Sequence, residues 1–166
     1  MDRYSERLIK TKASTGSILG LSFAIALTAA SLVLVVLSPP LGVLLVCGGI
    51  ALIVFLKDGL KVEYEFIITN GDIDIAKIYG AKRRKQVASI EAENMSKMTS
   101  ADDEHTMNDI SLGKYKVYKY LGKGDGDNVV AIYVGEGDNQ KIYLLDLDEK
   151  CVEHLNQILK TKSEIK

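Results

Sequence analysis

The chain has 166 residues, of which 47% are hydrophobic and 26% are charged, and this composition excludes an intrinsically disordered protein. The 21 basic and 22 acidic residues give a formal net charge of -1, so nucleic acid is not an expected partner. Two cysteines, Cys47 and Cys151, are too few for a disulfide framework and do not have the spacing of a zinc site. We expect neither a metal nor a cofactor.

In chain order, the first informative segment is residues 13–56, which hold no Asp, Glu, Lys, Arg or His. A helix needs about 20 apolar residues to cross the hydrocarbon core of a bilayer, and this segment is about twice that long. Pro39 and Pro40 divide it, because proline lacks an amide hydrogen and disfavours helix in the residue before it. The sequence therefore predicts two transmembrane helices, 17–38 and 41–56, joined by a tight turn at the prolines.

Two alternative interpretations of residues 13–56 are disfavoured. A cleaved signal peptide has a shorter apolar region, followed by a small-residue cleavage site and a polar mature chain. A water-soluble helical core would have to be buried by the rest of the chain, whose own apolar residues are already used in predicted strands. The membrane interpretation is therefore retained.

The distribution of basic residues predicts how the hairpin is oriented. They lie before the first span and just after the second, and none lies in the turn between: Arg3, Arg7, Lys10, Lys12, Lys57 and Lys61. By the positive-inside rule both termini are then cytoplasmic. We expect a multi-pass protein of the cell membrane with a short cytoplasmic segment, residues 1–16, a two-span hairpin, residues 17–56, and a cytoplasmic domain, residues 57–166.

Small residues recur every four positions from the residue before the first span into that span, at Gly16, Gly20 and Ala24, and form one stripe on the helix. Such a stripe lets a second helix approach closely. The partner is either the other span of the same hairpin or a second copy of the chain.

After the apolar segment, residues 62–69 and 72–79 alternate between apolar and polar, which is the period of a half-buried strand. Asn70 and Gly71 between them tolerate the positive φ values of a type I′ turn, so the two runs are expected to pair as a hairpin. A third strand is expected over 85–92. Residues 93–113 have no clear period and are interpreted as a long, partly mobile connection.

Strand patterns return at residues 115–121, 129–134 and 141–147, separated by loops rich in Gly, Asp and Asn that are typical of hairpins. The sheet is therefore expected to be mainly antiparallel. From Asp148 onward the apolar residues follow a helical period, which predicts an amphipathic C-terminal helix. Either Asp146 or Asp148 is placed to cap its start.

This order, several antiparallel strands followed by one amphipathic helix, resembles the pleckstrin-homology superfold, a bent barrel closed at one end by such a helix. More narrowly, the runs TNGDIDI at 69–75 and KRRK at 82–85, placed after two apolar segments, resemble a family of uncharacterised clostridial membrane proteins with a pleckstrin-homology-like cytoplasmic part. The resemblance implies an α+β protein of a bacterial membrane, with a helical hairpin followed by such a barrel. It implies no catalytic residue, because that family has no assigned activity.

The densest basic run in the chain is Lys82, Arg83, Arg84 and Lys85, close in sequence to the second span. Each such charge near an anionic leaflet contributes about 1 kcal/mol to membrane attraction. Two interpretations stay open, contact with anionic headgroups or an acidic partner, and a solvated hairpin loop. Specific phosphoinositide recognition is disfavoured, because the first hairpin turn is tight and carries no basic residue.

An enzyme is not predicted, because the two histidines, His105 and His154, have no serine or cysteine motif nearby. His154 is expected to be partly exposed at the edge of the terminal helix. Function is expected to be non-catalytic binding or scaffolding at the cytoplasmic face of a bacterial membrane. Its expected partners are membrane lipids and another membrane or cytoplasmic protein, or a second copy of the chain. The alternative is an accessory subunit of a transporter or envelope complex that acts through its transmembrane hairpin.

Overall fold

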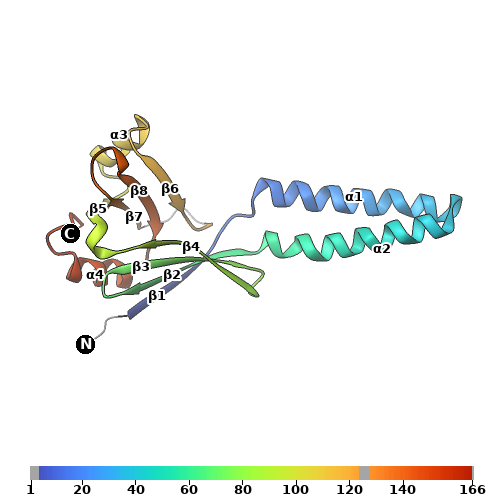
Figure 1. Ribbon diagram of the computed structural model, residues 1–166, viewed down its shortest axis with the longest axis horizontal. Helices are drawn as coiled ribbons and strands as arrows, with labels where there is room; N and C mark the ends of the chain where they lie inside the picture. Colours follow the sequence, from blue (N-terminus) through green and yellow to red (C-terminus); the bar gives the residue numbers. More distant parts are fainter. Residues whose placement is uncertain (1–3, 124–127, 166) are drawn as a thin grey trace. The chain divides into compact units, whose positions relative to one another are not determined.

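The computed structural model describes residues 4–123 and 128–165 (Figure 1). Within the chain, contacts define two compact units, which are described separately here. The sheet unit comprises Met1–Thr11, Glu63–Lys77 and Arg84–Lys166, and the helical unit comprises Lys12–Val62 and Ile78–Arg83. Residues 124–127, in the middle of the loop expected to join two strands as a hairpin, lie outside the described residues.

The helical unit contains α1, Thr15–Leu37, and α2, Pro39–Leu56, which continues into a short 3-10 helix η1, Lys57–Leu60. Both predicted helices are present, but the turn is not at the prolines. It lies at Ser38, and Pro39 and Pro40 form the first turn of α2. Proline suits this position, because the first amides of a helix have no intrahelical acceptor and the ring fixes φ near the helical value. The second span is therefore longer than the sequence predicted.

Small residues bring α1 and α2 into close contact. The buried residues of the two helices are Ala24 and Ser31 in α1 and Gly42 and Gly49 in α2. A Cβ atom added to Gly49 would lie within 2.1 Å of the Thr28 hydroxyl. The Thr28 and Ser31 hydroxyls donate to backbone carbonyls of their own helix, at 2.7 Å each, so these polar groups are satisfied inside an apolar element.

The large side chains of the same helices point away from the contact. In the most apolar 18-residue stretch of each helix, only 11% is buried. Both helices are long and apolar enough to cross a membrane. The exposed apolar residues include Ile18, Leu19, Phe23, Leu32, Val36, Leu41, Leu44, Ile50, Val54 and Phe55. A helix that is hydrophobic on all sides is typical of a membrane span or of the core of a large protein.

The first sheet of the sheet unit has the order β1-β2-β3-β4. Its strands are β1, Tyr4–Lys10, β2, Val62–Thr69, β3, Asp72–Tyr79, and β4, Arg83–Ile90. The predicted hairpin is confirmed, with φ values of 53° at Asn70 and 97° at Gly71. Strand β1 was not predicted. It pairs antiparallel with β2, with Tyr4 opposite Thr69 and Lys10 opposite Glu63.

The second sheet has the order β5-β7-β8-β6. Its strands are β5, Met95–Ser100, β6, Lys116–Tyr120, β7, Val129–Val134, and β8, Lys141–Asp146. The prediction of a long connection over residues 93–113 was wrong, because that segment forms β5 and helix α3, Glu104–Ser111. Two short 3-10 helices, η2 at Ala92–Asn94 and η3 at Gly137–Asn139, complete the elements before the terminal helix.

The expectation of a hairpin between β6 and β7 was also wrong. Strand β6 runs parallel to β8, with Tyr118 opposite Tyr143, whereas β7 is flanked by β5 and β8. Since β5 takes the free edge of β7, the remaining place for β6 is the far side of β8. In the part of the chain that the structure describes, the strands therefore form two four-stranded sheets and not a closed barrel.

The core of the sheet unit draws on both sheets and on α4, Glu149–Ile158. Phe66 and Ile75 from the first sheet, Ile132 and Leu145 from the second, and Leu155 from α4 are fully buried in one cluster. Of the two predicted caps for this helix, Asp148 is the one observed, and its side chain accepts from the Cys151 amide at 3.0 Å.

Candidate functional site

The basic run begins at the turn between β3 and β4. Gly80 and Ala81 both have a φ of 58°, and the Lys82 amide donates to the Tyr79 carbonyl at 3.1 Å, so this is a second tight turn. Lys82 follows the turn, and the other three basic residues open strand β4. All four are exposed.

Arg83 is part of the helical unit. Its Cζ atom is 5.8 Å from the centroid of the Phe55 ring, near the end of α2. The hairpin turn is tied to the same region, because the Gly80 amide donates to the Lys61 carbonyl at 2.7 Å. A guanidinium over an aromatic face is a cation–π contact, which contributes about 0.5–1 kcal/mol at an exposed site.

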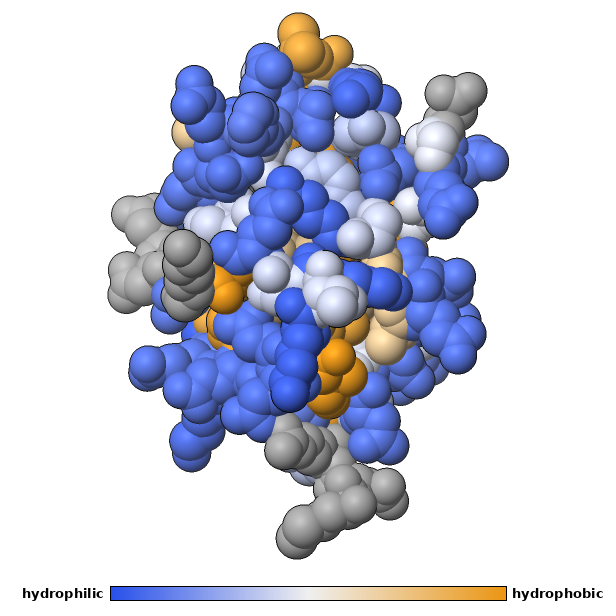
Figure 2. Space-filling model, turned by 90° about the vertical axis from the view of Figure 1, so that its left-hand side faces the viewer, coloured by the Kyte–Doolittle hydropathy of each residue, from blue (hydrophilic) through white to orange (hydrophobic). Residues whose placement is uncertain are grey.

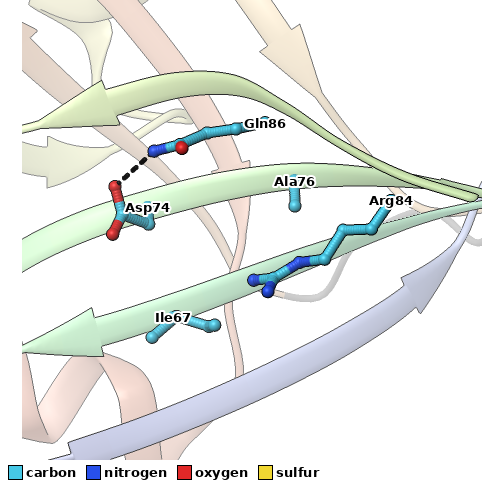
Figure 3. Close-up of a pocket in the computed structure, with 5 residues that line it drawn as sticks. All are labelled: Ile67, Asp74, Ala76, Arg84 and Gln86. Atoms are coloured by element: carbon cyan, nitrogen blue, oxygen red, sulfur yellow. Dashed lines mark hydrogen bonds between the residues drawn. The ribbon is translucent and has the colours of Figure 1, made fainter.

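Arg84 extends to the outer face of the first sheet, where it crosses Ala76 toward β2 (Figure 3). There its guanidinium forms an ion pair with Glu65. Beside this pair the Gln86 amide donates to Asp74 at 2.9 Å. Arg84 is thus matched by a carboxylate of its own sheet, and the hollow of about 400 Å³ around it carries both charge signs.

The four-residue run is consequently not one uniform basic patch. Within residues 4–123 and 128–165, Lys82, Arg83 and Lys85 have no carboxylate within ion-pair distance, while Arg84 has Glu65. The alternation of side chains along β4 explains the difference, because successive residues point to opposite faces of a strand. The cations available to an external anion are Lys82, Arg83 and Lys85.

The small-residue stripe of α1 is divided as well. Ala24 is buried against α2, and a Cβ atom on Gly20 would lie 3.9 Å from Leu56. Gly16 is exposed, and among the described residues its added Cβ would meet only Ser14. In this structure the stripe is used within the hairpin from Gly20 onward.

A buried polar cluster that the sequence did not reveal joins β1 to the region of α4. The Arg7 guanidinium pairs with Asp146 at 3.1 Å, and the Asp146 carboxylate also accepts from the Gly122 amide at 3.2 Å. Ser5 Oγ lies 2.7 Å from His154 Nδ1. The prediction of a partly exposed His154 was wrong, because β1, which was not predicted, covers it and leaves 8% of the residue exposed.

Cys151 lies in the same region and is 1% exposed. Burial raises the pKa of its thiol to about 12, since the apolar surroundings disfavour the thiolate. A thiol with such a pKa is not a nucleophile at neutral pH. The cluster accordingly holds β1 in place, and Cys151 contributes packing.

Four tyrosines form a contiguous row between the sheets. Tyr118 and Tyr143 are stacked with ring centroids 5.1 Å apart, Tyr120 lies 6.4 Å from Tyr143, and Tyr64 meets Tyr120 edge-on at 5.2 Å. All four are partly buried, and Tyr64, Tyr120 and Tyr143 pack beside the core. Desolvation by burial raises the pKa of both Tyr120 and Tyr143. The row therefore extends the core toward the partly exposed Tyr118.

The acidic segment 102–105 leads into α3 and includes its first two residues. Asp103 caps the helix, and its carboxylate accepts from the Thr106 amide at 3.2 Å and from the Thr106 hydroxyl at 3.3 Å. The hydrogen bond from the Thr106 amide lowers the pKa of Asp103. Among the described residues, no three His, Cys, Asp or Glu side chains are grouped so as to hold a metal ion.

Comparison with known proteins gives one match. The family model described as Bacterial PH-like domain (DUF6106) matches residues 1–164. No curated protein matches the chain. No solved structure matches it either.

Proposed function

Because the chain belongs to the bacterial PH-like domain family DUF6106, we propose that it is a membrane-anchored, non-catalytic binding module. Helices α1 and α2 cross a bacterial membrane, and both ends of the chain, with the two sheets, are on the cytoplasmic side. The hairpin holds the module at the membrane, which raises its effective concentration toward partners there.

The observation that carries the proposal is the inverted burial of the two helices. Their contact buries Ala24, Ser31, Gly42 and Gly49, whereas large side chains such as Phe23 and Leu44 are exposed. In water this arrangement would leave a large apolar surface unburied, at about 25 cal/mol per Å². In lipid it is favourable, since small residues let helices pack and large apolar residues contact acyl chains.

The sheet unit supports binding rather than chemistry. The face drawn in Figure 2 is mostly hydrophilic, with only small apolar areas. The groups that resemble catalytic ones, which are buried His154 and Cys151 and partly buried Ser5, lie between β1 and α4 and hold them together. Exposed Lys82, Arg83 and Lys85 provide cations for an anionic membrane surface or an acidic protein partner.

The topology is tested with single cysteines in the full-length chain, on a background in which Cys47 is replaced by alanine and buried Cys151 is kept. Ser38→Cys places a thiol at the turn between the helices, and Ser89→Cys places one on exposed strand β4. Intact cells are treated with a membrane-impermeant maleimide. We expect Ser38→Cys to be labelled in intact cells and Ser89→Cys only after the cells are permeabilised.

The reverse pattern would contradict the orientation. If neither variant reacts in intact cells and alkaline washing releases the protein from the membrane fraction, the membrane-spanning assignment is wrong. The background chain, without an introduced thiol, measures the residual reactivity of Cys151.

A further inference from the structure

One cavity lies within the helical unit. It has a volume of about 560 Å³ and is lined by Ala51, Val54 and Phe55 of α2, Asp58 of η1 and Arg83 of β4. Three lining residues are apolar, one is an acid and one is a base. The cavity therefore has an apolar wall and two opposite charges.

The two charges remain separate. Within the described part of the chain, neither Arg83 nor Asp58 has an ion-pair partner, and they do not pair with each other. Each lies beside a different neighbour. Arg83 stacks over the Phe55 ring at 5.8 Å, and the Asp58 carboxyl lies where a Cβ atom on Gly80 would be only 2.9 Å away. Glycine at position 80 thus leaves room for the carboxylate.

The position of the cavity along α2 indicates its surroundings, and this step rests on the proposed function. An α-helix rises 1.5 Å per residue, so α2, with 18 residues, spans roughly 27 Å of apolar thickness. Phe55 is its penultimate residue and Asp58 follows in η1. With α2 in a bilayer, the apolar wall lies among acyl chains, and Arg83 and Asp58 lie at the depth of the lipid headgroups.

We propose that this cavity binds one phospholipid with a zwitterionic headgroup of the phosphoethanolamine class. Its phosphate binds the Arg83 guanidinium, its ammonium group binds the Asp58 carboxylate, and an acyl chain lies along Ala51, Val54 and Phe55. Phosphatidylglycerol has no ammonium group. Its phosphate can bind Arg83, but nothing in its headgroup neutralises the Asp58 carboxylate, which would repel the phosphate. The charge pair therefore selects the zwitterionic lipid.

The test uses the full-length chain in nanodiscs made from equal amounts of phosphatidylethanolamine and phosphatidylglycerol. The protein is extracted in mild detergent, and the lipids that remain bound are measured by native mass spectrometry. We expect phosphatidylethanolamine to be enriched on the wild type. Arg83→Gln is expected to reduce its retention about tenfold, the effect of one charge-assisted hydrogen bond.

Asp58→Asn provides the second arm. It removes the charge that binds the ammonium group but keeps the shape of the side chain, so the preference for phosphatidylethanolamine over phosphatidylglycerol is expected to disappear. Lys119→Gln is the matched control, because Lys119 is an exposed cation of β6 that belongs neither to the cavity nor to the basic run, and its lipid retention is expected to equal that of the wild type.

Three results would overturn the inference. The first is a bound-lipid ratio equal to that of the disc in every variant, and the second is an equal loss in Arg83→Gln and Lys119→Gln. The third is displacement of the lipid by millimolar glycerophosphoethanolamine, which carries the headgroup without acyl chains and would identify a soluble ligand. If the chain does not elute with the discs, both the proposed membrane anchor and this site are rejected. If the chain inserts into the discs but enriches no lipid, only this site is rejected.

Discussion

The helical unit and the sheet unit bury opposite kinds of residue. In the sheet unit the buried side chains are large and apolar, as at Phe66 and Ile132, whereas in the helical unit Gly42, Gly49 and Ala24 are buried and the large side chains are exposed. This difference agrees with the proposed function, in which the two parts of the chain lie in different solvents. Water drives large apolar groups inward, and lipid removes that drive, so close backbone approach decides how the helices pack.

The largest expected difference comes from the same substitution made in each unit. Phe66→Ala removes a fully buried ring and is expected to lower the free energy of unfolding of the sheet unit by about 3–5 kcal/mol. Phe23→Ala is the matched control, because Phe23 is 68% exposed. Its effect on the same transition is expected to be below about 0.5 kcal/mol.

The measurement is urea unfolding of the full-length protein in detergent micelles, followed by tyrosine fluorescence. The chain has 8 tyrosines and no tryptophan, and residues 13–56 contain no tyrosine, so this signal reports on the chain outside the two helices. Equal losses from both substitutions would contradict the comparison, since Phe23 would then contribute to the stability of the sheets.

The next largest expected effect concerns the packing of α1 against α2, and it compares the same substitution at two neighbouring glycines of α2. Gly49→Leu forces a side chain into Thr28 of α1, whereas Gly48→Leu adds one where the first added atom meets no neighbour. We expect Gly49→Leu to weaken the hairpin by about 1–3 kcal/mol, as overpacking does elsewhere. Gly48→Leu is expected to leave it unchanged or slightly more stable, because leucine is the better helix former.

Loss of helical circular dichroism during titration with a denaturing detergent measures this difference. The two substitutions add the same side chain to neighbouring positions, so their effects on helix propensity are matched. Similar midpoints for the two variants would mean that α1 and α2 do not depend on the contact between Thr28 and Gly49.

Local patterns in the sequence predicted the elements that form locally. The alternation around Asn70 and Gly71, the uncharged helices and the amphipathic α4 all follow from neighbouring residues. Strand β5 was missed because a bulge between Met95 and Lys97 interrupts the period of two. Strand β1 was missed because its inward residues include Ser5 and Arg7, which are polar.

Only the local part of the candidate site could be predicted, because its other contacts join residues that are distant in the sequence. The basic run is visible in the sequence, but its division is not, because the residues that distinguish Arg83 from Arg84 lie far away along the chain. Phe55 lies beneath Arg83, and Glu65 pairs with Arg84. Asp58 gave no signal at all, since its place beside Gly80 depends on the fold.

The smallest expected effect concerns the contact between β1 and the start of α4. Asp148 caps α4 and lies 3.7 Å from Arg7, so Asp148→Ala is expected to cost about 1 kcal/mol at pH 7, the usual value of a helix cap. Burial opposes ionisation of Asp148, but the hydrogen bonds from Cys151 and the charge of Arg7 outweigh it, so its pKa lies below the ordinary 3.8.

A lowered pKa fixes the direction of the pH dependence. The carboxylate contributes its full stabilisation above pH 3.8, the value for the unfolded chain, and loses it as the pH falls through the lower pKa of the folded state. The gap in unfolding free energy between wild type and Asp148→Ala should therefore be constant from about pH 7 to 5 and narrow below 3.8. Asp148→Asn caps the helix without titrating. Its free energy of unfolding should therefore rise relative to that of the wild type as the pH falls below 3.8. If the difference in unfolding free energy between wild type and Asp148→Ala does not change with pH, the negative charge of Asp148 contributes nothing to the contact between β1 and α4. The side chain would then stabilise the helix equally well in its protonated form.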